Sequence, residues 1–206
     1  NTANLEYYGE SGALNESFAD VFGAMIDRDD WLIGEDVVNT SAFPSGALRS
    51  LINPNQGQPN NSFNTGWQPM HVNQQFTGQE DNNGVHINSG IPNHAFYQFA
   101  NAIGKTKAED VYYRALDKYL TKSSQFIDAR LAVIQAAQDL NLSANEVQAA
   151  RNAFDAVGIT DGNSTTTQTD IEVNPGEDII VYATEDLQSL SFIRPDGTVI
   201  AEGVAP

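Results

Sequence analysis

The spacing of apolar side chains separates a long first part of the chain, which has a helical period, from a short last part with a period of two. The first predicted helix starts at Gly12, with Ser11 as its N-cap, and runs to about Asp27. A rotation of about 100° per residue gives this helix an apolar stripe of Leu14, Phe18, Val21, Phe22 and Met25. Glu16 and Asp20 lie one turn apart on the opposite face.

Four further helices are predicted from the same period, over residues 88–102, 108–120, 124–140 and 144–157. Asn88 and Ser89 are expected to cap the first of them, and His94 within it is expected to be exposed. Ser143 is expected to cap the last helix, and Gly158 is expected to end it. These helices supply most of the predicted core.

Two segments between the first helix and the others lack this period. Residues 53–84 are rich in Asn, Gln, Pro and Gly, which is typical of an ordered surface loop. A short helical turn is expected around Ala47–Leu51.

The last part of the chain begins with a polar linker over residues 161–169. Apolar and polar residues then alternate, and Asn174-Pro-Gly and Pro195-Asp-Gly are turn signals. The expected architecture is therefore mainly α, with a helical domain over residues 1–160. A small β segment over residues 161–206 would suit the start of an accessory domain.

The charge of the chain excludes one class of partner. Lys and Arg total 10 and Asp and Glu total 27, which gives a formal net charge of −17 at pH 7. Nucleic-acid binding needs a basic surface, whereas an acidic one suits cation binding. No apolar run is long enough to cross a bilayer, so no membrane partner is expected. The chain contains no cysteine, which excludes disulfides.

Two acidic features suit metal binding. On the first helix, Glu16 can bind a metal while Asp20, one turn later, orients another ligand. A solvated acidic face explains the same spacing, so both interpretations stay open. The segment 27–36 carries five carboxylates, the oxygen ligands that calcium prefers. Its spacing does not match an EF-hand, and an ordinary acidic loop with Trp31 and Ile33 in the core is the alternative.

Five ordered motifs together resemble the thermolysin family of zinc metallopeptidases. They are Gly12-Ala-Leu-Asn-Glu-Ser-Phe-Ala-Asp20, Trp31-Leu-Ile-Gly-Glu-Asp36, Ala47-Leu-Arg-Ser50, Gly84-Val-His-Ile-Asn-Ser-Gly90 and Phe154-Asp-Ala-Val-Gly158. They cover about residues 2–160 and occur in the family's order. The short loop between Asp27 and Trp31 is similar to that of the vibriolysin and pseudolysin branch. The resemblance implies the helical C-terminal domain of a thermolysin-like peptidase.

The family's His-Glu-x-x-His helix, which supplies two zinc ligands and the general base, has no counterpart in this chain. The histidines here are His71, His86 and His94, and no two of them have the required spacing. The resemblance implies that this helix lies upstream of Asn1, in an N-terminal half that acts as a partner. Glu16 would be the third zinc ligand, and Asn15 and Asp20 would orient the upstream histidines.

The resemblance also implies roles in binding and catalysis. His86 would donate a hydrogen bond to the oxyanion, with Asp81 accepting from its other nitrogen, and Tyr7 would help to hold the oxyanion. Arg49 would reach the substrate carbonyl in a bidentate manner. Without the resemblance, His86 would suit a helix cap, Tyr7 a packing residue and Arg49 a surface ion pair.

Two further sets of residues follow from the resemblance. The pocket for the residue after the cleaved bond, which would prefer bulky apolar side chains, would be lined by Ile33, Val37 and Leu48. One calcium ion would be bound by Asp27, Asp30, Glu35 and the carbonyl oxygen of Leu32.

The expected function is therefore the C-terminal part of a secreted zinc metalloendopeptidase that cleaves peptides or proteins by zinc-activated water. The chain alone is expected to bind zinc weakly and to cleave nothing. The alternative is an inactive fragment or a calcium-stabilised binding domain.

Overall fold

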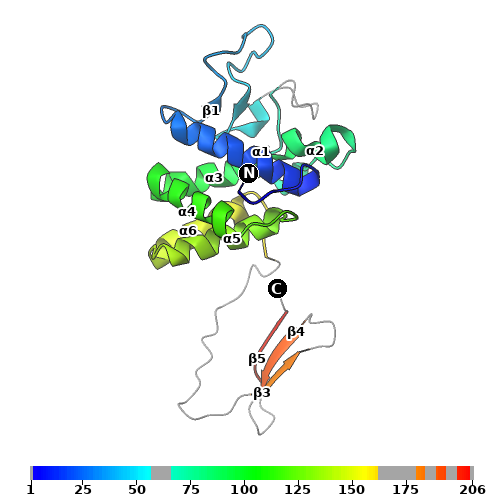
Figure 1. The fold of residues 1–206 in the computed structure, drawn as a ribbon, viewed down its shortest axis with the longest axis vertical. Helices are drawn as coiled ribbons and strands as arrows, with labels where there is room; N and C mark the ends of the chain where they lie inside the picture. The colour runs from blue at the N-terminus through cyan, green and yellow to red at the C-terminus, as the bar shows by residue number, and fades with distance from the viewer. Residues whose placement is uncertain (1, 57–65, 162–179, 184–188, 194–198, 205–206) are drawn as a thin grey trace. The chain divides into compact units, whose positions relative to one another are not determined.

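The computed structural model describes residues 2–56 and 66–161, together with strands at 180–183, 189–193 and 199–204 (Figure 1). The chain divides into two compact units, residues 1–160 and 161–206, which are described separately.

The helical unit confirms the mainly α architecture predicted from the sequence. Its α-helices are α1 (Gly9–Ile26), α2 (Glu80–Asn88), α3 (Gly90–Ile103), α4 (Lys105–Lys118), α5 (Phe126–Asp139) and α6 (Ala144–Ala156). In the described parts of the long loop before α2 lie the short 3-10 helices η1 (Pro54–Gln56) and η3 (Val72–Gln74). In Figure 1, α3 and α4 lie between α1 and the pair α5 and α6. None of the described helices is long and apolar enough to cross a membrane.

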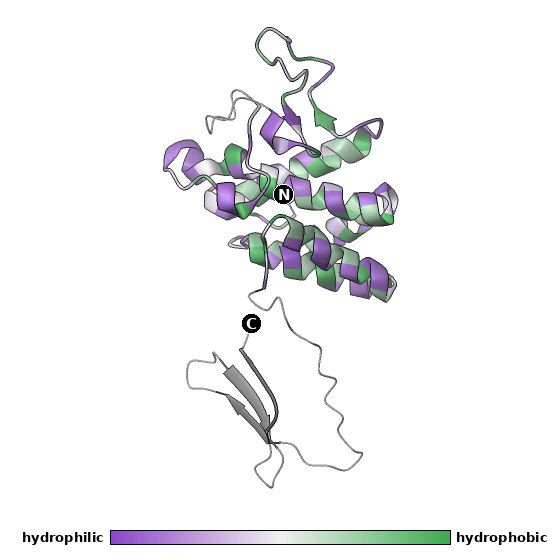
Figure 2. Ribbon diagram, turned by 180° about the vertical axis from the view of Figure 1, so that it is seen from behind, coloured by the Kyte–Doolittle hydropathy of each residue, from purple (hydrophilic) through white to green (hydrophobic). Residues whose placement is uncertain are grey.

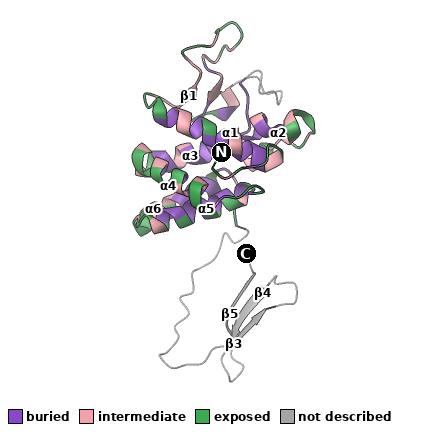
Figure 3. Cartoon of the chain, in the orientation of Figure 1, coloured by how far each residue is buried: buried purple, intermediate pink, exposed green. Residues whose placement is uncertain are grey.

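The core lies where the apolar stripe of α1 meets the helices beneath it. Leu14 and Val21 of α1 are fully buried, as are Phe96 and Phe99 of α3. The ring of Tyr112 on α4 lies 4.7 Å from that of Phe96, between centroids. Such aromatic pairs contribute about 0.5–1.5 kcal/mol beyond the area they bury. Figures 2 and 3 show the same division, with polar, exposed residues on the outer faces of the helices. This core fixes α1 and α3, which carry several of the candidate site residues.

The structure tests the predicted start of α1 and both predicted ends of α6. Ser143 caps α6 in a reciprocal capping box with Glu146, and Gly158 follows that helix with a φ of +80°, as predicted. The prediction for Ser11 is wrong, because α1 begins at Gly9 after Tyr8. The hydroxyl of Ser11 is buried and donates to the backbone oxygens of Lys122 and Ser124, which a local pattern does not reveal.

The helical turn expected around Ala47–Leu51 is not formed, because Arg49 and Ser50 belong to a β-strand. β1 (Leu32–Ile33) and β2 (Arg49–Ser50) form an antiparallel pair in which Ile33 lies opposite Arg49. Backbone hydrogen bonds from Leu48 to Ile33 and from Leu51 to Trp31 extend the pairing. Two-residue strands are too short to show a period, and their partner lies far away in the sequence.

Two expectations about α3 are also wrong. His94 is buried, because its Nδ1 lies 2.9 Å from the backbone oxygen of Leu51 and its ring stacks on Tyr97. Ser89 makes no side-chain cap, since its hydroxyl donates to the backbone oxygen of His86 and accepts from Gln68. These hydrogen bonds tie the start of α3 to the loop before α2.

The second unit contains an antiparallel sheet in the order β3-β4-β5, as its alternating pattern predicts. Its strands are β3 (Ile180–Ala183), β4 (Ser189–Ile193) and β5 (Val199–Val204). The turn signals at Asn174 and Pro195 lie outside the described residues.

Candidate active site

Tyr7, Glu16 and His86 meet beside the first half of α1. The Tyr7 hydroxyl donates to Oε1 of Glu16 at 2.6 Å and lies 3.0 Å from Nε2 of His86. Oε2 of Glu16 lies 3.8 Å from the same nitrogen. Gly12 permits this meeting, because a Cβ there would lie 2.4 Å from a methyl group of Val85 on α2. A side chain at this position would push apart the two helices that carry Glu16 and His86.

Asp81 holds the other side of the His86 ring. Its Oδ1 lies 2.6 Å from Nδ1 of His86, and its Oδ2 accepts from the backbone N–H groups of His86 and Ile87. The reason is an unusual turn, since all four residues of Asp81–Gly84 have positive φ between 50° and 80°. Asp, Asn and Gly tolerate this left-handed conformation best, which explains the sequence Asp-Asn-Asn-Gly. The turn folds the carboxylate back over the start of the helix and onto the ring.

The protonation of this cluster follows from its donors and acceptors. Desolvation of the hydroxyl, then its hydrogen bond to Glu16 and the charge of Glu16, raise the pKa of Tyr7 above its ordinary value. Tyr7 therefore keeps its proton and donates a hydrogen bond to Glu16. A carboxylate oxygen of Asp81 faces Nδ1 of His86, and the Tyr7 hydroxyl oxygen faces Nε2, so each ring nitrogen lies opposite an oxygen.

Asp20 lies behind the cluster and pairs with Arg49. The side chain of Asp20 is buried, and its two oxygens accept from Nε and Nη2 of Arg49 at 2.8 and 2.6 Å. Asn93 of α3 donates to the same carboxylate at 2.9 Å. Sequence reasoning missed Asn93, which lies outside every motif used. Asn15, the neighbour of Glu16, donates to the backbone oxygen of Leu5 and so holds the segment before Tyr7.

The three predicted pocket residues differ in exposure. Ile33 and Leu48 are half-buried and lie side by side through the β1–β2 pairing. Gly34 follows Ile33 with a φ of +80°, and a Cβ there would lie 3.3 Å from Cβ of Leu48. Val37 is 86% exposed, on the turn that follows.

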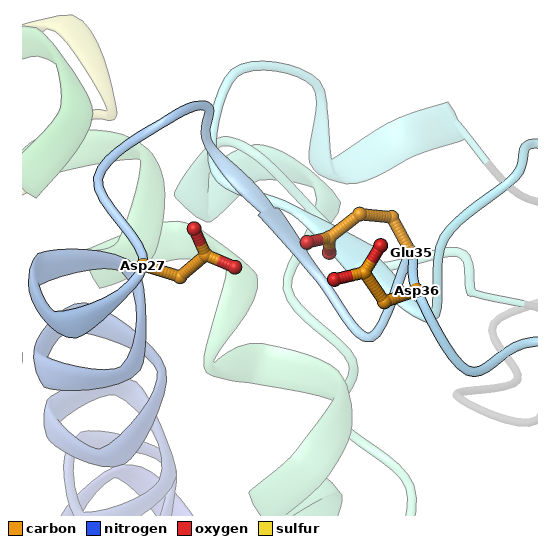
Figure 4. A group of neighbouring side chains, drawn as sticks. All are labelled: Asp27, Glu35 and Asp36. Atoms are coloured by element: carbon orange, nitrogen blue, oxygen red, sulfur yellow. The ribbon is translucent and has the colours of Figure 1, made fainter.

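A second acidic group forms at the end of α1. Carboxylate oxygens of Asp27, Glu35 and Asp36 all lie within 4.8 Å of one another. Figure 4 shows the carboxylates of Glu35 and Asp36 pointing back toward Asp27. Among the described residues, the buried Oε2 of Glu35 has no hydrogen-bond partner. Oδ1 of Asp30 instead accepts from the backbone N–H of Leu32 at 2.7 Å, so Asp30 shapes the loop.

This group matches the predicted calcium ligands only in part. Asp27 and Glu35 belong to both sets, whereas Asp36 was missed, although its place directly after Glu35 was a signal. The Asp30 carboxylate is not one of the three carboxylates in this group.

The fold and the cluster around Glu16 and His86 define a class of protein, the metallopeptidases of the thermolysin type. A sequence model of the thermolysin metallopeptidase alpha-helical domain matches residues 3–159. The chain therefore belongs to this family.

Comparisons with individual proteins agree with this family assignment. The chain is 48% identical to an extracellular elastase of Staphylococcus epidermidis over 158 residues, covering 77% of this chain and 29% of that protein. It is 50% identical to bacillolysin of Bacillus amyloliquefaciens over 159 residues, covering 77% and 28%. The solved precursor of protealysin from Serratia proteamaculans superposes with a TM-score of 0.67 at 32% identity, covering 77% of this chain and 52% of that one.

The chain spans less than a third of the length of these two curated relatives. The assignment to the vibriolysin and pseudolysin branch stays a prediction.

Proposed function

We propose that this chain is the C-terminal part of a secreted zinc metalloendopeptidase. The observation that carries the proposal is the meeting of Tyr7, Glu16 and His86, with Asp81 fixed behind the histidine. Relatives named elastase and bacillolysin, one of them described as extracellular, support the same activity and location.

Glu16 fits the role of a zinc ligand. A carboxylate is a common zinc donor, and the Glu16 side chain keeps 22% of its surface exposed beside His86. Within the described residues, no Lys or Arg forms an ion pair with Glu16, whose carboxylate neighbours the Tyr7 hydroxyl and Nε2 of His86. Two histidines from an N-terminal half would complete the site. Zinc held there would supply a Lewis acid and would lower the pKa of a bound water.

The residues of this chain would act on the charge that develops on the substrate. His86 would donate from Nε2 and Tyr7 from its hydroxyl, so both would stabilise an oxyanion beside Glu16. Asp81 fixes the ring so that Nε2 points at this position. Asp20 and Asn15 would orient the histidines of the N-terminal half.

Substrate binding would use the β1–β2 region. Arg49 is held by Asp20 at the edge of the cluster and would contact a substrate carbonyl. Ile33, Leu48 and Val37 would accept a bulky apolar residue after the cleaved bond.

Calcium would bind at the second acidic group. Asp27, Glu35 and Asp36 offer oxygen ligands, and the unpartnered oxygen of Glu35 fits a bound cation. Asp30 and the Leu32 carbonyl stay predicted ligands. The same group supports the alternative function, a calcium-stabilised binding domain without turnover.

A reconstitution experiment tests the proposal. The protein containing both halves should bind zinc and cleave peptides, and a chelator should stop the cleavage. The chain alone should cleave nothing, and Glu16→Ala in the reconstituted protein should lose zinc. Chelator-sensitive proteolysis by the chain alone, or a zinc-loaded protein with both halves that cleaves nothing, would contradict the proposal.

A further inference from the structure

Lys105, the first residue of α4, lies against the loop that leaves α1. Its Nζ donates to the backbone oxygens of Arg28 and Asp30 at 2.8 and 2.9 Å. The same ammonium lies 4.1 Å from the centroid of the Trp31 ring. The Lys105 ammonium group is therefore held by three residues of one short loop, Arg28, Asp30 and Trp31.

The loop that Lys105 contacts is short and connects two parts of the acidic group. Asp27 lies at its start, and Glu35 and Asp36 follow it after β1. Its far end is anchored separately, since the Trp31 ring packs edge-on against Phe96 and Tyr97 of α3. Lys105, together with the ion pair between Arg28 and Glu109, therefore joins the other end of the loop to α4.

Partial burial supports a structural role for this ammonium. Desolvation, followed by the charge of Arg28, lowers the pKa of Lys105, while Asp30, Asp29 and Asp27 act in the opposite direction. A lysine in water would avoid this desolvation. The carbonyl oxygens and the indole face replace part of the water that it loses.

We propose that Lys105 is a positioning residue that holds the loop at Arg28–Trp31 in the shape that places Asp27 opposite Glu35 and Asp36. Its ammonium group is a cation within the chain that holds the backbone oxygens of Arg28 and Asp30 in place before calcium binds. The inference rests on the calcium site proposed above.

Lys105 can affect calcium affinity through its charge or through its contacts with the loop. Removing the side chain would change the affinity in opposite directions in the two cases, so the inference can be tested. Repulsion between an ammonium and calcium would weaken binding, so loss of the charge would tighten it. This repulsion is screened beyond about 8 Å at physiological ionic strength. An ordered loop lowers the entropy cost of bringing the ligands together, so loss of the contacts would weaken binding. The contacts of Lys105 favour the second effect.

The test compares variants of the chain by calcium titration against a fluorescent chelator. Lys105→Met should raise the Kd for calcium by about tenfold. Lys105→Arg should restore much of the affinity, because a guanidinium can donate to both carbonyls and stack on Trp31. Lys107→Met is the matched control, since Lys107 lies on the same helix, is 58% exposed and pairs with Glu146 instead. It should leave the Kd unchanged.

A calcium-free measurement reads the loop directly. Amide hydrogen exchange at Leu32, whose N–H is bonded to Asp30, should be faster in Lys105→Met than in the parent chain. Lys105→Gln, which keeps a polar side chain, provides the same comparison if the methionine variant does not fold.

The outcomes separate the two proposals. Equal or tighter calcium binding by Lys105→Met, or a loop that exchanges no faster, overturns the role of Lys105. Absence of calcium binding by the parent chain overturns the calcium site itself.

Discussion

The cluster around His86 and the acidic group at the end of α1 differ in how their charged and polar side chains are paired. In the first, the contacts of Asp81 and Tyr7 lie within the chain, and they already orient the His86 ring. In the second, three carboxylates face one another, and a buried oxygen of Glu35 has no partner among the described residues.

The difference indicates what each region needs from outside. The His86 cluster has its geometry before any ligand binds, so single substitutions there should change catalysis more than folding. Among the described residues, no Lys or Arg forms an ion pair with the three carboxylates of the acidic group, so its stability should depend on a cation. The predictions below test this contrast, from the largest expected effect to the smallest.

The largest effect is expected for His86→Ala in the protein with both halves. If His86 acts when charge develops on the substrate oxygen, kcat should fall by about 10²–10³ while KM changes little. Metal analysis should find the zinc retained, because His86 is not a ligand in this proposal.

Glu16→Ala is the matched comparison, since it should lose the zinc as well as the activity. Loss of zinc from His86→Ala would make His86 a ligand, and a near-normal kcat would remove its catalytic role.

Asp81→Asn should have an intermediate effect. The backbone should be preserved, because Asn also tolerates the positive φ of 55° found at this position. The amide no longer carries the negative charge that faces Nδ1 of His86, and loss of such an orienting carboxylate costs about 10–100-fold in activity. Measured kcat between those of the parent and His86→Ala, with zinc intact, is the expected result. Activity equal to the parent would show that ring orientation does not need the carboxylate.

Glu35→Gln tests the other side of the contrast through stability. For the parent chain, calcium at about 100 times its Kd should add about 2.7 kcal/mol, because it binds the folded state. For a chain of this size that corresponds to a Tm higher by about 5–11 °C. Glu35→Gln should lose this gain, yet without calcium it should be at least as stable as the parent, since one repelling charge is gone.

Asp117→Asn is the control for a general change in acidity, because Asp117 pairs with Lys118 outside the acidic group. It should keep the full response to calcium. A Glu35→Gln variant that still gains stability from calcium would show that Glu35 is not a ligand.

Local pattern was sufficient for much of the fold. The apolar stripe through Leu14 and Val21 is the buried face of α1, and Ser143 with Gly158 correctly predicts both ends of α6. Each of these signals lies within a few residues of the feature that it predicts. The contact between His86 and Asp81 was instead expected from the resemblance, and the structure shows that a five-residue separation and a left-handed turn bring the two side chains together.

Several of the errors have a different cause, which is contact between residues far apart in sequence. His94 is buried because the backbone of Leu51 accepts its hydrogen bond, and Arg49 lies on a strand because Ile33 pairs with it. Asn93 was missed for the same reason, as its partner Asp20 is 73 residues away. The spacing of apolar and polar residues within one segment does not show which distant residues its side chains will contact.

The smallest effect is expected where a carboxylate is already satisfied by the chain. Glu146 accepts from the backbone and hydroxyl of Ser143 and pairs with Lys107, and these contacts lower its pKa to about 2. Its folded pKa lies below the unfolded value of about 4.3, so its contribution is present above that pH and is lost as pH falls toward 2. Glu146→Gln should therefore lower Tm at pH 7 by only about 1–3 °C, with the difference from the parent shrinking on acidification. Unlike Glu35→Gln, it should leave the response to calcium unchanged. Melting curves at pH 7 and pH 3, each with and without calcium, measure both points. A calcium response that falls equally in the two variants would mean that calcium acts on the whole acidic surface, and the contrast between a self-sufficient carboxylate and one that needs a cation would not hold.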